Sequence, residues 1–175
     1  MTADDVPAVS AIRVSGWKAA YEGILPRSFL DAMTVEADVR RRRRYFEEAN
    51  ELTADLVAVD TGGRVVGWAC LGRSDDTGTG PDTGELHALY VQPSLTGSGI
   101  GGTLLDAAHA HADAVGLAPV VLWVLADNTG ARRFYERAGY TADGAVQEDD
   151  YDGVSVPEVR YRRGPAERDR PSART

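Results

Sequence analysis

The sequence is poor in the residues that form cross-links and metal sites, with one cysteine, Cys70, and three histidines among 175 residues. A single cysteine excludes a disulfide framework and a cysteine-based metal site within one chain. The longest strongly apolar run, residues 120–126, is far shorter than the roughly 20 residues of a membrane helix. The opening MTADDVPAVS lacks the basic and then apolar order of a signal peptide. We therefore expect a reduced, cytoplasmic protein that holds no metal and contacts no membrane.

Basic residues are the minority charge, with 19 Lys and Arg against 27 Asp and Glu and a formal net charge of −8. This acidity argues against binding to nucleic acid and suits a cationic small substrate. The basic run at 40–44 lies in a predicted helix and points to every face of it, so we interpret it as solvated surface, with phosphate contact as the lesser alternative. The length suits one domain, which we place at 1–163, followed by a flexible tail at 164–175.

The hydrophobic pattern predicts an α/β domain with a mixed, mostly antiparallel sheet flanked by helices. His109 and His111 are expected on a helix surface. Asp149, Asp150 and Asp152 are expected in a loop that either attracts cations or is simply solvated. The predicted helices cover residues 4–21, 29–33, 36–48, 99–115 and 129–138, and the predicted strands cover 56–58, 65–68, 86–91, 120–125, 140–146 and 155–161.

A glycine-rich segment, LYVQPSLTGSGIGG at 89–102, joins a predicted strand to a predicted helix. Glycine lets a ligand approach the backbone closely, and a helix N-terminus offers free N–H groups to phosphate. The alternative is a tight turn without a ligand. Four glycines in six positions lose more conformational entropy on folding than such a turn requires, which favours a ligand. Gly97, Gly99 and Gly102 also fit G-x-G-x-x-G, so an NAD-dependent oxidoreductase is a second alternative. The order of elements argues against this alternative. In a dinucleotide-binding fold the glycine motif opens the first βαβ unit, whereas here helices and a hairpin come before it.

The segments LYVQP, TGSGIGGTLL and VLWVLADNTGARRFYERAGY resemble the coenzyme-A-binding core of the GCN5-related N-acetyltransferases. The opening WKAAYEGILPRSFLDAM resembles the first helices of a branch that acetylates small molecules. The resemblance spans all but the tail. Two features depart from the family pattern: Thr96 replaces the Gln or Arg that opens the glycine signature, and the strand that usually precedes the first helix is absent from the sequence given.

The resemblance implies a single-domain fold that binds acetyl-CoA and transfers the acetyl group directly to the amine of a small molecule. Tyr135 would protonate the departing thiolate, although an aromatic residue on this helix face is also typical of core packing. Arg132 and Arg133 are better placed for phosphate than the run at 40–44. A homodimer is a further expectation from the family. The resemblance assigns cofactor contacts to Leu89, Tyr90, Val91, Thr96, Gly97, Ser98, Gly99, Ile100, Gly101, Asn128, Ala131 and Tyr135.

The proton acceptor is predicted from the residues themselves, and the residues that would bind the amine are implied by the resemblance. Strand alternation places Glu85, His87, Leu89 and Val91 on one face. We expect Glu85 to accept a proton through water, with His87 as second candidate and a merely solvated Glu85 as the alternative. Trp17, Tyr21 and Glu22 would bind the cationic amine, or Trp17 simply packs the helix on the sheet. A non-enzymatic acyl-CoA sensor would keep the glycine loop and lack the acid and base.

Overall fold

A computed structural model describes residues 1–164, so most of the predicted tail lies outside the described residues. The chain begins with three helices, α1 (Val6–Ala20), α2 (Arg27–Ala32) and α3 (Val35–Glu48), after a 3₁₀ turn at Ala3–Asp5. Two further helices, α4 (Ile100–Val115) and α5 (Thr129–Arg137), come between the later strands. The strands are β1 (Ala54–Val59), β2 (Val65–Arg73), β3 (Gly84–Val91), β4 (Val120–Leu125), β5 (Thr141–Tyr151) and β6 (Val154–Arg163).

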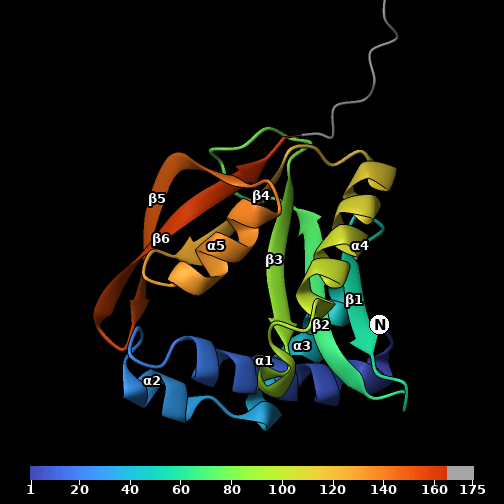
Figure 1. The fold of residues 1–175 in the computed structure, drawn as a ribbon, viewed down its shortest axis with the longest axis vertical. Coiled ribbons are helices and arrows are strands. Elements are labelled where there is room, and N and C mark those ends of the chain that lie inside the picture. The colour runs from blue at the N-terminus through green and yellow to red at the C-terminus, as the bar shows by residue number, and fades with distance from the viewer. Residues whose placement is uncertain (165–175) are drawn as a thin grey trace, which may run out of the picture.

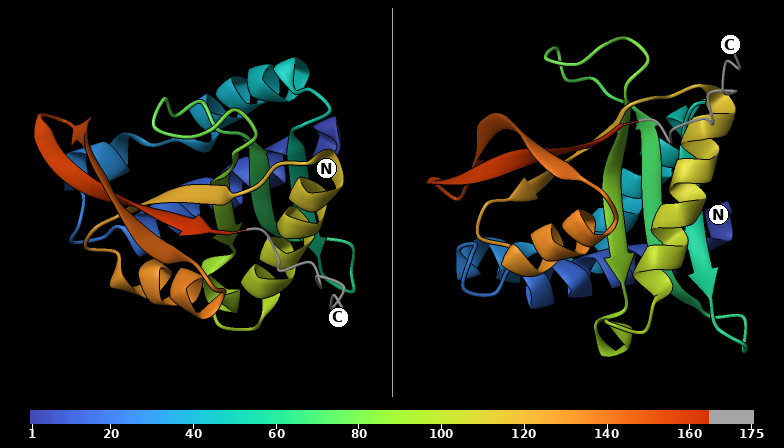
Figure 2. Two further views of the ribbon diagram at one scale, coloured as in Figure 1. Left: turned by 90° about the horizontal axis from the view of Figure 1, so that it is seen from above. Right: turned by 45° about the horizontal axis from the view of Figure 1, so that its top comes forward.

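The strands form one sheet in the order β1-β2-β3-β4-β6-β5, in which only β3 and β4 are parallel. Helices α1 and α3 cover one face and α4 and α5 cover the other (Figures 1 and 2). The predicted mixed, mostly antiparallel sheet with flanking helices is confirmed. Helix α4 packs closely because β2 carries Gly67, where a Cβ would lie 2.9 Å from the Leu104 side chain. Within residues 1–164, no helix is both long and apolar enough to cross a membrane.

Strands β3 and β4 separate soon after they meet. Their pairing consists of Gly84 with Val120 and Glu85 with Val121, after which the two strands diverge (Figure 2, right). The edge of β3 that faces β4 is therefore left without a strand partner from Leu86 onward. Unpaired backbone N–H and C=O groups on such an edge are available to a ligand.

The predicted alternation along β3 is wrong because the strand contains a bulge at His87. Cys70 of β2 pairs with Ala88, whereas the next residue, Leu71, pairs with Leu86, so His87 is the extra residue. A bulge reverses the alternation beyond it. Leu89 and Val91 consequently pack into the core under α4, together with Leu86. Tyr90 instead joins Glu85 and His87 on the α1 face of the sheet.

The last two strands are longer than predicted, and Asp149 and Asp150 belong to β5 rather than to a loop. They are joined by the two residues Asp152 and Gly153, which have φ values of 54° and 80°. Two positive φ values are typical of the tight turns whose twist matches a β-hairpin. The Asp-Gly pair is thus the signal that the sequence interpretation overlooked. It fixes the register that places Gln147 opposite Glu158.

Two predicted surface groups are partly buried. His109 of α4 is 8% exposed, and its Nε2 lies 2.8 Å from the hydroxyl of Tyr140. His111 is half-buried, with its Nε2 3.4 Å from the carbonyl of Leu52. The prediction that both histidines are surface residues is therefore wrong, because α4 packs flat on the sheet: His109 faces the core, and His111, on a different face of the helix, lies against the segment before β1.

The basic run on α3 is not uniformly solvated, since Arg42 is 8% exposed. Its guanidinium lies 3.8 Å from the centre of the Trp68 ring, and its Nε lies 3.5 Å from Asp38. Asp38 also contacts Arg13 at 2.7 Å and Arg41 at 2.8 Å. Burial alone would raise the pKa of Asp38, but these three cations lower it instead. The cluster fastens α1 and α3 to the sheet.

We expect Asp38→Asn to lower the free energy of unfolding by about 3 kcal/mol, because it leaves buried guanidinium groups without their counter-charge. Urea denaturation measures this loss. Asp31→Asn is the matched control, since the Arg27–Asp31 pair is largely exposed and is worth less than about 1 kcal/mol. Because the folded-state pKa of Asp38 is lowered, the difference between parent and variant narrows as the pH falls below the ordinary value of 3.8. Equal losses in the two variants would contradict the assignment.

Candidate active site

A cavity of about 260 Å³ opens on the α1 face of the sheet, beside the gap between β3 and β4. It is lined by aromatic and acidic side chains from α1, β3, β4 and the β5–β6 hairpin, and no lysine or arginine is among the lining residues. The lining residues are Trp17, Tyr21, Glu85, Leu86, His87, Tyr90, Trp123, Leu125, Gln147, Asp149, Tyr151 and Glu158. This combination can hold a cation against ring faces and carboxylates.

The aromatic wall is built by helix spacing and the β3 bulge. Trp17 lies in the last turn of α1 and Tyr21 caps its C-terminus, and their ring centroids lie 4.9 Å apart in edge contact. The Trp17 indole N–H donates to the hydroxyl of Tyr90 at 2.7 Å. Burial, together with Tyr90, raises the pKa of Tyr21 far above its usual range. Burial raises the pKa of Tyr90 as well, so the hydroxyls of Tyr21 and Tyr90 are neutral at physiological pH and act as hydrogen-bonding groups.

Glu85 lies at the start of β3 and points into the cavity with 16% of its side chain exposed. Its Oε1 lies 3.3 Å from Nδ1 of His87, and its Oε2 accepts from the Ser74 hydroxyl at 2.8 Å. Burial would raise the pKa of this carboxyl, but the contacts with His87 and Ser74 outweigh it and lower the pKa. Glu85 is therefore ionised at neutral pH.

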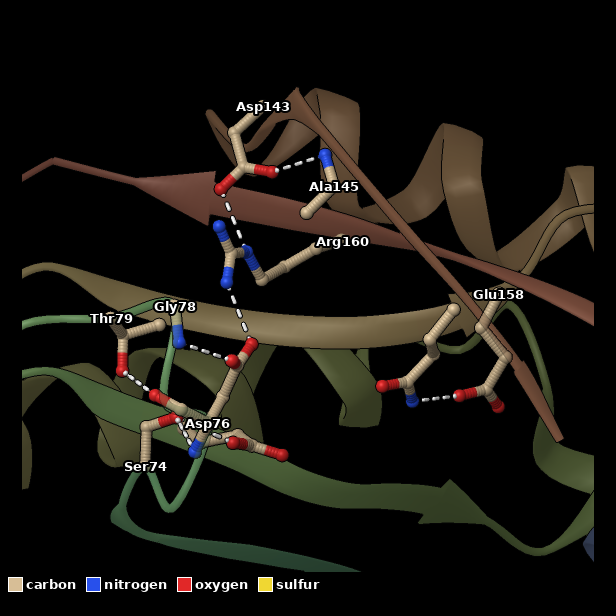
Figure 3. Close-up of polar contacts among 10 residues, drawn as sticks. Ser74, Asp76, Gly78, Thr79, Asp143, Ala145, Glu158 and Arg160 are labelled. Atoms are coloured by element: carbon tan, nitrogen blue, oxygen red, sulfur yellow. Dashed lines mark hydrogen bonds and ion pairs between the residues drawn. The ribbon is translucent and has the colours of Figure 1, made fainter.

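Glu158, on β6, is the acidic residue that the sequence interpretation missed. It accepts a hydrogen bond from the Gln147 amide at 2.7 Å (Figure 3). Burial raises its pKa, and repulsion from Asp149 and Glu85 adds to the effect. The cavity thus contains two carboxylates whose pKa values are pushed in opposite directions, an arrangement typical of functional sites. The Asp-Gly turn could have revealed Glu158, because the hairpin register follows from it.

The glycine loop lies beyond the other end of β3, at the start of α4. Gly97 and Gly99 have φ values of 83° and 91°, and a Cβ on either would meet only open space. Among the described residues, no backbone carbonyl accepts from their N–H groups, whereas the N–H of Ser98 donates to Leu95. The free N–H groups of the first turn of α4 adjoin them. These groups form a cradle that suits an anion.

The second predicted element of the cofactor site is the start of α5. The Asn128 side chain accepts from the N–H of Ala131 at 3.1 Å and caps the helix, as expected. Tyr135 packs between Phe134 and Tyr140, with centroids 5.1 and 5.8 Å away. Burial raises the pKa of Tyr135, and Tyr90 contributes to the rise. Within residues 1–164, no group is hydrogen-bonded to its hydroxyl, so this proton is free to serve a ligand.

Several predicted contacts lie elsewhere. Glu22 is exposed outside the cavity, because α1 ends before it and the chain turns away. Of the three hairpin aspartates, only Asp149 lines the cavity, while Asp152 accepts from Ser28 at 2.7 Å. Arg132 turns inward and donates to the Tyr161 hydroxyl and the Ala126 carbonyl, so it is not free for phosphate.

Comparison with known proteins identifies the family of the chain. The family model described as Acetyltransferase (GNAT) family matches residues 17–140. The chain belongs to the GNAT family. As a GNAT protein it is an acyltransferase, and the alternatives of a non-enzymatic sensor and an NAD-dependent oxidoreductase are not supported.

Similar proteins include an N-acetyltransferase of Mycobacterium tuberculosis, described as "Probable N-acetyltransferase Rv2775", which is 31% identical over 90% of this chain and 87% of that protein. Mycothiol acetyltransferase of Pseudarthrobacter chlorophenolicus is 40% identical, but the match spans 49% of this GNAT chain and only 27% of that protein. The PaiA N-acetyltransferase of Thermoplasma acidophilum, solved with coenzyme A, is 19% identical and superposes with a TM-score of 0.72 over 94% of this chain and 95% of that one. This last likeness concerns the fold.

We expect Glu158→Gln to raise the melting temperature at neutral pH. When the folded-state pKa of a carboxyl is raised, ionisation of that carboxyl destabilises the folded protein at neutral pH. A glutamine cannot ionise, so the substitution removes this destabilisation. The gain should disappear as the pH falls below about 4, where the carboxyl holds its proton in both the folded and the unfolded state. Thermal unfolding over a pH series measures it, with Glu148→Gln, an exposed carboxylate of β5, as the control. A lower melting temperature at neutral pH would contradict the assigned shift.

Proposed function

We propose that this GNAT protein uses acetyl-CoA to acetylate a primary amine on a cationic small molecule by direct attack on the thioester. One observation carries the proposal: a phosphate-type loop follows β3, the edge of β3 toward β4 is free beyond Glu85, and the same strand lines an acidic, aromatic cavity. The first pair of features suits a long, polar donor that ends in a pyrophosphate. The cavity suits an acceptor that arrives positively charged.

The donor half of the site fits the shape of coenzyme A. The N–H groups of Gly97, Gly99 and the first turn of α4 would bind the pyrophosphate. The unpaired edge of β3 between Leu86 and Val91 would bind the amide groups of the pantetheine arm, as a neighbouring strand would. A backbone N–H of this edge, which we assign to Val91, would polarise the thioester carbonyl. Acetyl-CoA, when bound, supplies the activated acyl group.

The acceptor half has to remove a proton before the amine can react. An alkyl ammonium has a pKa near 10.4, so freeing the amine at neutral pH costs roughly 4–5 kcal/mol. Ionised Glu85 would accept this proton through water, while the aromatic wall and Glu158 hold the rest of the cation. The amine nitrogen then forms its bond to the acyl carbon as the carbon–sulfur bond breaks. Tyr135 would donate its free hydroxyl proton to the departing sulfur.

The direct test is mass spectrometry of a library of amines incubated with the enzyme and acetyl-CoA, with a parallel sample that lacks the enzyme. We expect acetylated products from small primary amines that carry positive charge. Neutral and acidic amines should be poor acceptors, because the cavity is lined by carboxylates. Absence of any acetylated amine, together with calorimetric binding of NAD in place of acetyl-CoA, would overturn the proposal.

Two substitutions in the glycine loop separate backbone from side-chain contacts. Thr96→Ala should change acetyl-CoA affinity by less than the ~1 kcal/mol of an ordinary hydrogen bond, because the cradle is formed by backbone N–H groups. Gly99→Ala should weaken binding more, because φ is 91° there and a side chain costs about 1–2 kcal/mol in the left-handed region. Titration calorimetry measures both. A large loss in Thr96→Ala would instead assign the phosphate contact to its hydroxyl.

Tyr135→Phe keeps the ring packing and removes the hydroxyl proton. Since no described group is hydrogen-bonded to that hydroxyl, the melting temperature should stay within experimental error. Turnover should fall by roughly 10²–10⁴, as is typical when a general acid is lost. Steady-state kinetics with the acceptor found in the library, beside thermal unfolding, measure the two effects. Full activity in the variant would leave Tyr135 with a packing role only.

Glu85→Gln should leave acetyl-CoA affinity unchanged and depress kcat/KM, because the proton acceptor is removed. In the parent, kcat/KM should fall on the acid side as Glu85 takes up a proton, and the lowered pKa places this limb at acidic pH. The variant should lose the limb. A pH–rate profile of both proteins is the measurement. If the limb persists unchanged, the proton acceptor is His87 or water.

A further inference from the structure

Arg160 of β6 joins three elements near the acceptor cavity (Figure 3). Its Nη1 donates to Asp76 at 2.6 Å, and its Nε donates to Asp143 at 2.8 Å. The guanidinium also lies 5.6 Å from the ring centre of Trp123, which lines the cavity. The Arg160 side chain is 13% exposed, so both ion pairs are shielded from water and are stronger than ordinary surface pairs. The side chain therefore holds Asp76 firmly.

Asp76 in turn organises the loop at residues 74–83, between β2 and β3. Its carboxylate accepts from the N–H of Gly78 at 2.7 Å. Its carbonyl oxygen accepts from the N–H of Thr79 at 3.0 Å and from the hydroxyl of the same residue at 2.7 Å. At the start of the loop, the N–H of Asp76 donates to the hydroxyl oxygen of Ser74 at 3.3 Å. The conformation of the loop is thus built around the residue that Arg160 holds.

Ser74 is where this loop meets the cavity. Its hydroxyl oxygen accepts from Asp76 and its proton is donated to Glu85 at 2.8 Å. A continuous series of contacts therefore runs from Arg160 through Asp76 and Ser74 to Glu85. We propose that Arg160 is a positioning residue for acetyl transfer, which anchors the loop so that Ser74 holds the carboxylate of Glu85 in place. The inference rests on the proposed function for the role of Glu85.

The charges around Glu85 explain why the anchor matters. His87 and Ser74 stabilise the carboxylate, while Asp76 and Glu158 repel it and burial disfavours its charge. Asp149 lines the same cavity. Without the Ser74 hydrogen bond, less would oppose the effects of burial and of the neighbouring carboxylates. The pKa of Glu85 would then rise, and Glu85 would hold its proton up to a higher pH. Arg160 acts on this balance through the loop rather than as a direct contact of Glu85.

The test is a double-substitution cycle on Glu85 itself. The side-chain carboxyl of Glu85 is titrated by carbon-detected NMR in the parent, Arg160→Gln, Ser74→Ala and the double variant, with Glu85→Gln to assign the signal. We expect each single variant to move the titration midpoint to higher pH, and the double variant to move it no further than Ser74→Ala alone. Such non-additivity is the signature of residues that act through one another. Ser74→Thr, which keeps the hydroxyl, should restore the parent midpoint.

Two further variants guard against a merely structural effect. Asp143→Asn removes the other partner of Arg160 but leaves the loop attached, so it should lower stability without moving the Glu85 midpoint. Arg160→Lys keeps a cation that reaches only one carboxylate. It should give an intermediate midpoint, and it stands in if Arg160→Gln does not fold.

Kinetics give a second readout with the acceptor from the library. In Arg160→Gln, kcat/KM on the acid side should fall roughly tenfold, the ratio that corresponds to one hydrogen bond to a charged group, and recover at higher pH. An unchanged Glu85 midpoint in both Arg160 variants, or additive shifts in the cycle, would overturn the positioning role. A parent enzyme that acetylates no amine would instead overturn the proposed function, since the NMR titration does not depend on turnover.

Discussion

The divergence of two parallel strands is the constraint on which the rest of the site depends. Because β3 and β4 pair at only two positions, the sheet contains an opening at its centre, where a continuous sheet would satisfy every backbone group. The cost of those unpaired groups is offset only if something else binds them. The glycine loop before α4 and the start of α5 lie on one side of this opening, and the acidic cavity lies on the other. Under the proposed function, donor and acceptor would approach from these two sides.

The two sides of this opening have opposite electrostatic character. On the loop side, α4 presents the N-terminal end of its dipole together with free N–H groups, which favour negative charge. On the cavity side, Glu85, Asp149 and Glu158 favour positive charge. The cradle that suits an anion is formed by backbone groups rather than by lysines, in a chain with a net charge of −8. This arrangement would let an acidic protein hold the proposed phosphorylated donor and still attract a cation.

The sequence predicted the architecture, which the structure confirms, and it singled out the glycine loop that we propose for the donor, because both follow from local signals. The spacing of apolar residues predicted the helices and strands, and four closely spaced glycines predicted the loop before α4. The acceptor half depended on non-local pairing. The bulge at His87 arises from how β3 fits β2, and it moved Leu89 and Val91 to the core while turning Tyr90 into the cavity. The role of Glu158 in the cavity was not predicted, because the neighbours of a strand residue on the adjacent strand can be named only when the register of the hairpin is known. The inward turn of His109 similarly depends on the packing of α4 and not on its own sequence.

The length of the tight turn between β5 and β6 sets which β5 residues line the cavity, so evolution can change the cavity without changing the glycine loop. Side chains on a strand alternate between faces, so one residue gained or lost at Asp152 and Gly153 would exchange every inward residue of β5 for an outward one. Gln147 and Asp149 would leave the cavity together, and their neighbours would enter it. The glycine loop, the edge of β3 and Tyr135 lie on other elements and would keep their places. Under the proposed function, a single change in loop length could therefore alter which acceptor binds while the binding of the donor stayed the same.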